Sequence, residues 1–521
     1  MGNTIYYWIT TIAYSALVII LGFVSWNKAR GKTATGQILD FWIASRELPG
    51  WRLAVSLTSG WLMLGWLGYG MSMVYQMGLS GAWMLFIPWF ILCFIIIWMV
   101  PFVRRLPAIS LPEALAKRFG TDTRYIFALC SIFVFTSWTG AELYMMGHLG
   151  APFLNVSPVA VMIIIVIPVM LYTFFGGFRA DVLTDVAQFL IMAPFIVILA
   201  IVGLSAAGGI TQGNILGRLA ETATPYYGQG SMFRLFACGI AMPIILLFAY
   251  LPGWMVEQDL LQRIQAAKSL KQAYRMAYFS FVLIIVFVLI FPLLTAFSAI
   301  VLFPPGAETS AAAIGSDATG IISAIILKYF PIWAQILMLV GIIASQMSTV
   351  DTFANVTAMP LSYDLIQPIF FKKAPRPVAL QWTRILAVIA ILLGFVYAIN
   401  ATSLMDVYIL SSGVLTASIA IPAFAIFWKK ANKLGVTLSA IMGFVGNVVF
   451  YILEYHVWKH NFQPKWFADT YLGYIIIGLI GSVLGLVIGS LIGKPSSQEQ
   501  LAVVAPKPLE GMEIFDLAKE P

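Results

Sequence analysis

The 521-residue sequence predicts an all-α polytopic membrane protein with about thirteen transmembrane helices. Two observations support this class. Hydrophobic residues make up 61% of the chain and charged residues only 10%, which is far from the balance of a soluble domain. Thirteen apolar runs are also long enough to cross a hydrocarbon core, which takes about 20 residues each. These runs are residues 5–26, 51–77, 80–103, 123–150, 157–175, 180–206, 234–256, 274–302, 321–350, 379–399, 405–428, 433–454 and 470–494.

The distribution of Lys and Arg predicts which side of the membrane each end of the chain occupies. When the chain crosses thirteen times with its N-terminus outside, 25 of the 30 basic residues fall on the cytoplasmic side, Arg179 and Arg263 among them. The net charge of +8 then follows from the positive-inside bias and requires no nucleic-acid partner. We therefore predict a plasma (inner) membrane protein with a cytoplasmic C-terminus, functional as a monomer in the lipid bilayer.

Cysteine and histidine usage argues against an enzyme or a zinc protein. Cys93, Cys130 and Cys238 all lie inside predicted spans, and none has a metal-ligand partner at the usual spacing. With three histidines and no motif that combines serine, cysteine and histidine, the chain has little to support catalysis. We predict that it is not an enzyme.

Two of the predicted helices are interrupted. The segment TSGWLMLGWLGYG at 58–70 carries four glycines, each of which costs about 1 kcal/mol against alanine in a helix. The helix 234–256 contains Pro243 and then Pro252-Gly253, and an interior proline removes a backbone hydrogen bond. Taken alone, the glycines would favour close helix packing. Together the two helices, each opening a group of five spans, favour two inverted five-helix repeats.

This interpretation divides the chain into six segments. A first helix and its cytoplasmic linker precede the first repeat, an external loop separates the repeats, and two further helices and a cytoplasmic tail follow the second. The predicted boundaries are 1–50, 51–206, 207–233, 234–428, 429–494 and 495–521.

A polar face is predicted in IIASQMSTVDTFANV, residues 342–356, at the end of the helix 321–350 or continuing it. At 100° per residue, six polar side chains share one face of this helix. They are Ser345, Ser348, Thr349, Asp351, Thr352 and Asn355. Such hydroxyl, carboxylate and amide oxygens suit a small hard cation. The alternative is a polar seam that bonds to a neighbouring helix.

Four motifs make the chain resemble the sodium:solute symporter family. They are GGFRADVLTDVAQ at 176–188, WMVEQDLLQRIQAAKSLKQA at 254–273, ASQMST at 344–349, and FWKKANKLGV after the helix 405–428. The resemblance covers about residues 40–450. It implies a LeuT-type core of two inverted five-helix repeats, with one helix before it and two after. It also implies inward symport of a small solute with sodium as the coupling ion.

The resemblance also implies a set of sodium ligands. The family's shared site uses two main-chain carbonyls of the broken first core helix, which fall on Ser59 and Leu62. It also uses a carbonyl and two hydroxyls of the eighth core helix, which fall on Ser345, Ser348 and Thr349.

Asp185 lies one turn inside an apolar run, where a carboxylate needs an explanation. The resemblance implies an additional sodium site formed by Asp185, Ser348, Asp351 and Thr352. Asp351 stands where a hydroxyl is expected, so it could strengthen the site, bind a proton instead, or point away. The alternative for Asp185 is a structural pair with Arg179 or another basic residue.

The solute is not identified by the sequence. Aromatic residues of the two interrupted helices could stack on a sugar ring, enclose a quaternary amine, or simply wall an apolar pocket; they are Trp61, Trp66, Tyr69, Tyr250 and Trp254. Glu142 lies within a span and could attract a cationic group. The residues that bind sugar in sugar-transporting members are not matched here, which disfavours a hexose symporter. An uncoupled facilitator or channel and a membrane-embedded solute sensor stay open as alternatives.

Overall fold

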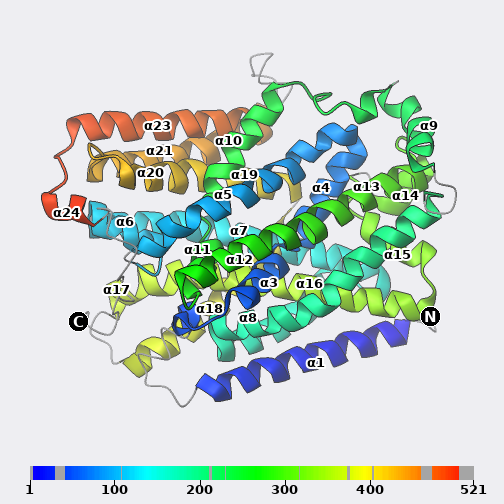
Figure 1. Cartoon of the computed structure of the whole chain (residues 1–521), viewed down its shortest axis with the longest axis horizontal. Helices are drawn as coiled ribbons and strands as arrows, with labels where there is room; N and C mark the ends of the chain where they lie inside the picture. Colours follow the sequence, from blue (N-terminus) through cyan, green and yellow to red (C-terminus); the bar gives the residue numbers. More distant parts are fainter. Residues whose placement is uncertain are drawn as a thin grey trace.

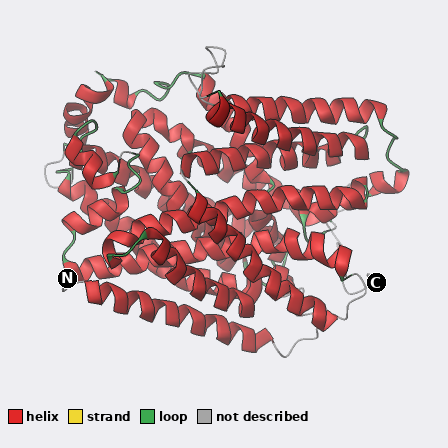
Figure 2. Cartoon of the chain, turned by 180° about the vertical axis from the view of Figure 1, so that it is seen from behind, coloured by secondary structure: helices red, strands yellow, loops and turns green. Residues whose placement is uncertain are grey.

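A computed structural model of the chain describes residues 4–29, 41–106, 108–209, 214–228, 230–315, 317–371, 376–401, 404–458 and 472–503. Helices are the only regular secondary structure in these residues, as Figure 2 shows. Ten of the described helices are long and apolar enough to cross a bilayer, and two shorter apolar helices, Thr4–Ile20 and Pro158–Phe174, accompany them. The predicted all-α membrane class is confirmed, while the number thirteen stays a prediction.

The first part of the chain supplies one peripheral helix and the first group of core helices. In chain order these are α1 (Thr4–Ala29), η1 (Ala44–Arg46), α3 (Gly50–Trp61), α4 (Leu64–Met77), η2 (Gly78–Met84), α5 (Phe86–Arg105), α6 (Leu111–Phe119), α7 (Thr121–Leu154), α8 (Pro158–Ala206) and α9 (Ile215–Tyr227). The short helix α9 occupies the predicted external loop 207–233.

The second part repeats the pattern and ends in a peripheral pair. In chain order its elements are η3 (Ser231–Phe233), α10 (Ala241–Met255), α11 (Gln258–Ala266), α12 (Leu270–Leu283), η4 (Ile284–Ile290), α13 (Phe291–Leu302), α14 (Glu308–Ile314), α15 (Ile321–Tyr329), α16 (Ile332–Met359), η5 (Pro360–Ile366), α17 (Gln367–Phe370), α18 (Arg376–Asn400), α19 (Leu404–Val414), η6 (Leu415–Ala420), α20 (Ile421–Phe424), η7 (Ala425–Phe427), α21 (Lys433–Ile452), η8 (Leu453–Val457), α23 (Gly473–Ile492) and α24 (Gln498–Ala502).

The predicted helix 321–350 begins at the expected residue but consists of two helices. Pro331 separates α15 from α16, because the residue before a proline avoids the helical region and Phe330 is extended (φ −102°, ψ 140°). The helix that carries the polar face therefore starts at Ile332 and continues to Met359. The predicted helix 234–256 likewise begins only at Ala241.

Both predicted interruptions occur, close to the expected residues. Between α3 and α4 the chain leaves helical geometry at Leu62 (φ −80°, ψ 48°) and Met63 (φ −72°, ψ 107°). Between α10 and α11 it does so at Glu257 (φ −57°, ψ 130°), five residues after Pro252. Pro243 lies inside α10 near its start and does not break it.

Figure 1 shows which helices lie at the two edges of the molecule. α1 runs along one edge against α8, and α21 and α23 lie together at the opposite edge. Between these edges α16 packs against α7 and α8. From Gly341 to Met359 every residue of α16 is buried, so its polar side chains face other helices rather than lipid.

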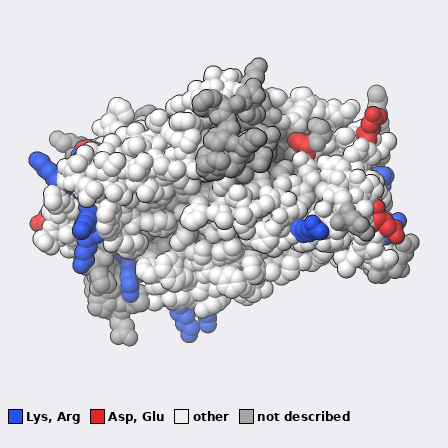
Figure 3. Space-filling model, turned by 90° about the horizontal axis from the view of Figure 1, so that it is seen from above, with Lys and Arg blue, Asp and Glu red and all other residues white. Residues whose placement is uncertain are grey.

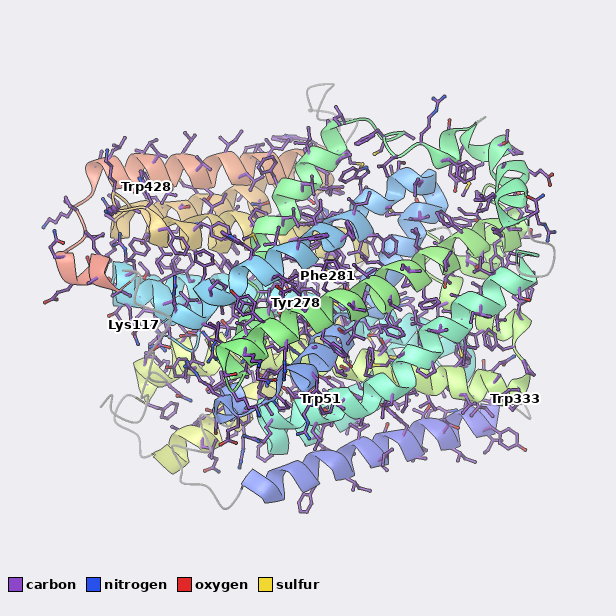
Figure 4. All side chains as sticks on the ribbon, in the orientation of Figure 1. Trp51, Lys117, Tyr278, Phe281, Trp333 and Trp428 are labelled. Carbon is purple, nitrogen blue, oxygen red and sulfur yellow. The ribbon has the colours of Figure 1, made fainter. Side chains whose placement is uncertain are left out.

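Charged side chains gather toward the two ends of the molecule, and the surface between them is almost free of charge on the face shown in Figure 3. Lys117 and Trp428 lie at one end, near α24, and Trp333 lies at the other, where α1 begins (Figure 4). The start of α1 and the end of the described chain thus lie at opposite ends of the long axis, as the predicted topology requires. Which end faces the cytoplasm stays a prediction.

Candidate functional site

The interruption between α3 and α4 lies directly against the polar face of α16. The Ser345 hydroxyl donates a hydrogen bond to the Leu62 carbonyl, which is free of helical bonding at the break. The Ser348 and Ser59 hydroxyl oxygens are 3.0 Å apart. The Thr349 hydroxyl donates to the carbonyl of Ser345 within its own helix, at 3.0 Å. The structure therefore brings Ser59, Leu62, Ser345 and Ser348 together, while the Thr349 hydroxyl bonds to its own helix. Whether these residues bind sodium stays a prediction.

Asp185 adjoins the same group. Its carboxylate accepts from the Ser348 hydroxyl at 2.5 Å and from the Ser56 hydroxyl at 2.6 Å. It also pairs with a guanidinium nitrogen of Arg263 at 3.5 Å. Arg263 is 1% exposed, although its sequence neighbourhood placed it on the cytoplasmic side. The buried carboxylate therefore has a buried cation of the protein beside it.

The alternative pairing of Asp185 with Arg179 does not occur. Arg179 instead donates to the carboxylate of Glu47 at 2.6 Å and to the carbonyl of Ala44 at 2.8 Å. The alternative of a pair with another basic residue is realised, through Arg263. This arginine lies in the segment 254–273 and reaches back across α3.

The structure divides the predicted additional sodium site into two groups. Thr352 accepts from Arg263 at 3.2 Å, so it reaches Asp185 through the guanidinium. Asp351 turns the other way and accepts from the Thr173 hydroxyl at 2.6 Å. Of the three possibilities left open for Asp351, the geometry favours a side chain that points away from Asp185.

Aromatic rings from four helices surround Trp66 near the start of α4. The ring centroid of Trp66 lies 4.2 Å from that of Tyr408, 5.8 Å from Tyr250, 5.9 Å from Trp254 and 6.3 Å from Trp138. These rings touch one another, so a solute could enter between them only if they part. We refer to Trp66, Tyr69, Trp138, Tyr250, Trp254 and Tyr408 as the aromatic cluster.

Trp61 lies outside this cluster. It stacks on Trp89 with ring centroids 6.2 Å apart, and its indole N–H donates to Asp259 at 2.9 Å. Asp259 in turn faces Arg263 at 3.6 Å. Trp61 therefore packs beside the Asp185 and Arg263 pair. It is joined to the aromatic cluster indirectly, because the Trp89 ring centroid lies 6.0 Å from that of Trp254.

Glu142 is completely buried at the edge of the aromatic cluster. Its carboxylate accepts from the backbone N–H of Gly65 at 3.0 Å and from the Tyr408 hydroxyl at 2.5 Å. With its amide nitrogen turned toward the carboxylate, Gln346 donates to it at 3.0 Å. Gly65 is the second residue of α4, so Glu142 lies at the positive end of that half-helix, where a negative charge is favoured.

Four contributors to the site were not predicted as such. Arg263 and Ser56 hold Asp185, while Gln346 and Tyr408 hold Glu142. Gln346 had a signal, because it is the one polar residue off the predicted face within the segment 342–356. Arg263 had a weaker one, since it follows Asp259 by one helical turn.

Comparison with known proteins decides the family. A model of the sodium:solute symporter family matches residues 41–443, which is most of the chain. The chain belongs to the sodium:solute symporter family. Its fold is of the LeuT type and sodium is its coupling ion, as the resemblance implied.

Two relatives and one solved structure show how far the similarity extends. The high-affinity proline transporter PutP of Bacillus subtilis (strain 168) is 24% identical over 447 residues, covering 82% of this chain and 88% of PutP. The sodium/sialic acid symporter NanT of Aliivibrio fischeri (strain ATCC 700601 / ES114) is 22% identical over 502 residues, 92% of each chain. The outward-open structure of a Na⁺-coupled sialic acid symporter superposes with a TM-score of 0.73 at 20% identity, over 95% of this chain and 98% of that one. These sodium:solute symporters are transporters, so the prediction that the chain is not an enzyme is confirmed.

Proposed function

We propose that this sodium:solute symporter imports a small organic solute that carries a positively charged ammonium group, by alternating access. The observation that supports this solute class is Glu142. Its carboxylate is completely buried and lies against the aromatic cluster, where the two interrupted helices meet.

The charge at Glu142 favours a cationic partner. Its hydrogen-bond donors are neutral, and in the described part of the chain no Lys or Arg forms an ion pair with it. A buried charge without a counter-charge is costly, so a cationic solute beside it would be stabilised. The faces of Trp and Tyr rings attract cations by about 0.5–2 kcal/mol each. The start of α4 could otherwise bind the carboxylate of a solute. Glu142 already occupies that position, so a solute carboxylate there would be repelled by it.

The sodium ion is proposed to bind between α3 and α16. The carbonyls of Ser59 and Leu62 and the oxygens of Ser345, Ser348 and Thr349 are hard ligands of the kind that small cations prefer. Hydroxyl hydrogens now point from Ser345 to Leu62 and from Ser348 to Asp185. These hydrogens would turn away when the oxygens face an ion.

Ion and solute sites share two short stretches of chain, which gives a physical basis for coupling. On the broken helix, the ion ligand Leu62 precedes by three residues Gly65, which holds Glu142. On α16, the ion ligand Ser345 directly precedes Gln346, which also donates to Glu142. An ion that fixes the break therefore also fixes the carboxylate that is proposed to receive the solute.

Uptake into proteoliposomes under an inward sodium gradient tests the solute class. Choline and its uncharged isostere 3,3-dimethylbutan-1-ol form a matched pair, to be screened within a panel of amino acids, betaines, sugars, carboxylates and nucleobases. We expect ammonium-bearing solutes to compete best, and Glu142→Gln to weaken them by about ten- to a hundredfold, as expected for loss of a charged partner. Glu454→Gln, the same change at a buried carboxylate of η8, is the control.

Two outcomes would contradict the proposal. Equal competition by the charged and uncharged isosteres would exclude a role for charge at Glu142. Uptake that does not saturate, or that proceeds equally without sodium, would instead favour a facilitator or a channel.

A further inference from the structure

Two further carboxylates face each other one helical turn away from the Asp185 group. Asp181 lies four residues before Asp185 on α8, and Asp351 lies three residues after Ser348 on α16. Each is 1% exposed. The two are neighbours through Asn355, which lies one turn after Asp351 on α16 and whose amide nitrogen donates to Asp181 at 2.7 Å. Two neighbouring carboxylates repel each other unless something positive lies between them.

Polar side chains of both helices complete this group. The Asn355 amide donates to one oxygen of Asp181 at 2.7 Å, and the Thr173 hydroxyl donates to one oxygen of Asp351 at 2.6 Å. Three oxygens are left without a hydrogen-bond partner, namely Asp181 Oδ1, Asp351 Oδ2 and Asn355 Oδ1. Buried acceptors are rarely left unsatisfied, and these are all oxygens.

The charges of this region do not balance with protein groups alone. Asp181 and Asp351 form no ion pair with a Lys or Arg among the described residues. The nearby Arg263 already faces both Asp185 and Asp259. Four buried carboxylates thus share one guanidinium, and uncompensated charges in a dry interior are strongly disfavoured.

We propose that Asp181 and Asp351 bind a sodium ion, with the amide oxygen of Asn355 and the hydroxyl oxygen of Thr173 as neutral ligands. This site is separate from the one at Leu62 and Ser345, and it rests on the proposed function only for the identity of the ion. Carboxylate, amide and hydroxyl oxygens are ligands for hard cations. Magnesium would keep several waters and calcium would need six to eight oxygens, which makes sodium the better fit to a small dry group.

The position of this site in α8 gives the ion a mechanical role. Gly177 interrupts α8 with φ 60° and ψ −168°, and Thr173 lies before this break while Asp181 lies after it. An ion held by both would tie the two halves of α8 to each other and to α16. Its binding would therefore stiffen the break, and its release would free it.

Equilibrium binding of ²²Na⁺ to the purified full-length protein tests the site directly. We expect Asp181→Asn and Asp351→Asn each to remove one sodium ion per protein, and Thr173→Val to weaken that ion at least tenfold while keeping the fold. Hydrogen exchange around Gly177 should be slower in Na⁺ than in K⁺ for the wild type, and equal in both for the two asparagine variants. Thr349→Ala, which removes a hydroxyl proposed to bind the other ion, should leave this ion bound.

These binding measurements separate a failure of the Asp181 and Asp351 site from a failure of the proposed sodium symport. Loss of binding in Thr349→Ala alone, with Asp181→Asn and Asp351→Asn binding as many ions as the wild type with affinity within twofold, would overturn the inference but not the symport. The reverse pattern would support the inference and contradict the ion site at Leu62. Displacement of the ion by micromolar calcium would overturn the assignment to sodium.

Discussion

Ser348 contacts partners on two other helices, since its hydroxyl meets Asp185 of α8 and Ser59 of α3. We expect Ser348→Ala to raise the sodium concentration for half-maximal uptake by about three- to tenfold, as loss of one polar ligand predicts. Thr357→Val on the same helix, whose hydroxyl bonds only to its own backbone, is the control. Unchanged sodium dependence in Ser348→Ala and Thr349→Ala, at equal membrane abundance, would exclude the site between α3 and α16.

The pair of Asp185 and Arg263 predicts a compensating double variant. Asp185→Asn leaves a buried guanidinium with one carboxylate partner fewer, and breaking a buried pair typically costs about 3–5 kcal/mol. We expect a lowered thermal midpoint for Asp185→Asn and for Arg263→Gln, with substantial recovery in the double variant.

Reversal potentials of the same variants test whether Asp185 also binds a transported ion. If Arg263 is its counter-charge, the double variant should keep the wild-type ratio of sodium to solute. A ratio lowered by one ion in both Asp185→Asn and the double variant would mean instead that Asp185 is a sodium ligand. Arg179→Gln, which leaves this group intact, serves as the control.

The start of α4 tolerates no side chain at Gly65. A Cβ atom there would collide with the Tyr408 hydroxyl and come within 2.6 Å of the Glu142 carboxylate. We expect Gly65→Ala to abolish uptake at normal membrane abundance. At Gly68, one turn later, a Cβ atom would meet the flexible tip of Met145, so Gly68→Ala should retain most activity. Equal loss in both variants would indicate that the helix itself, rather than Glu142, is disturbed.

The break in α8 depends on Gly177. Its dihedral angles are accessible almost only to glycine, and a Cβ atom would collide with the Phe41 ring. We expect Gly177→Ala to lower the free energy of unfolding by about 1–3 kcal/mol and to slow transport. Thermal unfolding and initial uptake rates measure the two effects, and a variant as stable and as fast as the wild type would show that α8 does not need this break.

Helix positions were more predictable than helix ends and side-chain partners. Hydropathy located the apolar runs, and glycine and proline marked both interruptions, because each residue has a local cost in a helix. The limit of α16 at Ile332 was missed although Pro331 signals it, since the apolar run continues across the proline. Local composition does not reveal such a break when both flanking segments are equally apolar.

The candidate site was predicted in part. Ser345 and Ser348 were expected to face a partner, and they do. That Asp351 joins Thr173 rather than Asp185, and that Arg263 returns from α11 to fill the Asp185 group, depend on how α8 and α11 pack. A pattern along one helix gives the direction of a side chain but not the identity of the helix it meets.

On the face shown in Figure 3, the exposed charges gather toward two ends of a long apolar body, and the predicted topology assigns those ends to opposite sides of the membrane. In a Cys238→Ser background, we expect Trp333→Cys to react with an impermeant maleimide in intact cells. Lys430→Cys, beside Trp428 at the other end, should react only after permeabilisation. The reverse pattern would invert the topology, and Cys93 and Cys130 are buried and should not interfere.

Arg263 bears on the driving force of transport, because a charge that is fixed in the carrier is not moved across the membrane. A sodium ion that moves inward across 100 mV releases about 2.3 kcal/mol, enough on its own for roughly fiftyfold accumulation of an uncharged solute. Arg263 balances a carboxylate in the same region but is covalently attached, so it never leaves the carrier and draws nothing from the gradient. A cationic solute would itself be pulled inward by the voltage. The steepness of accumulation would then depend on the solute's own charge as well as on the number of ions released.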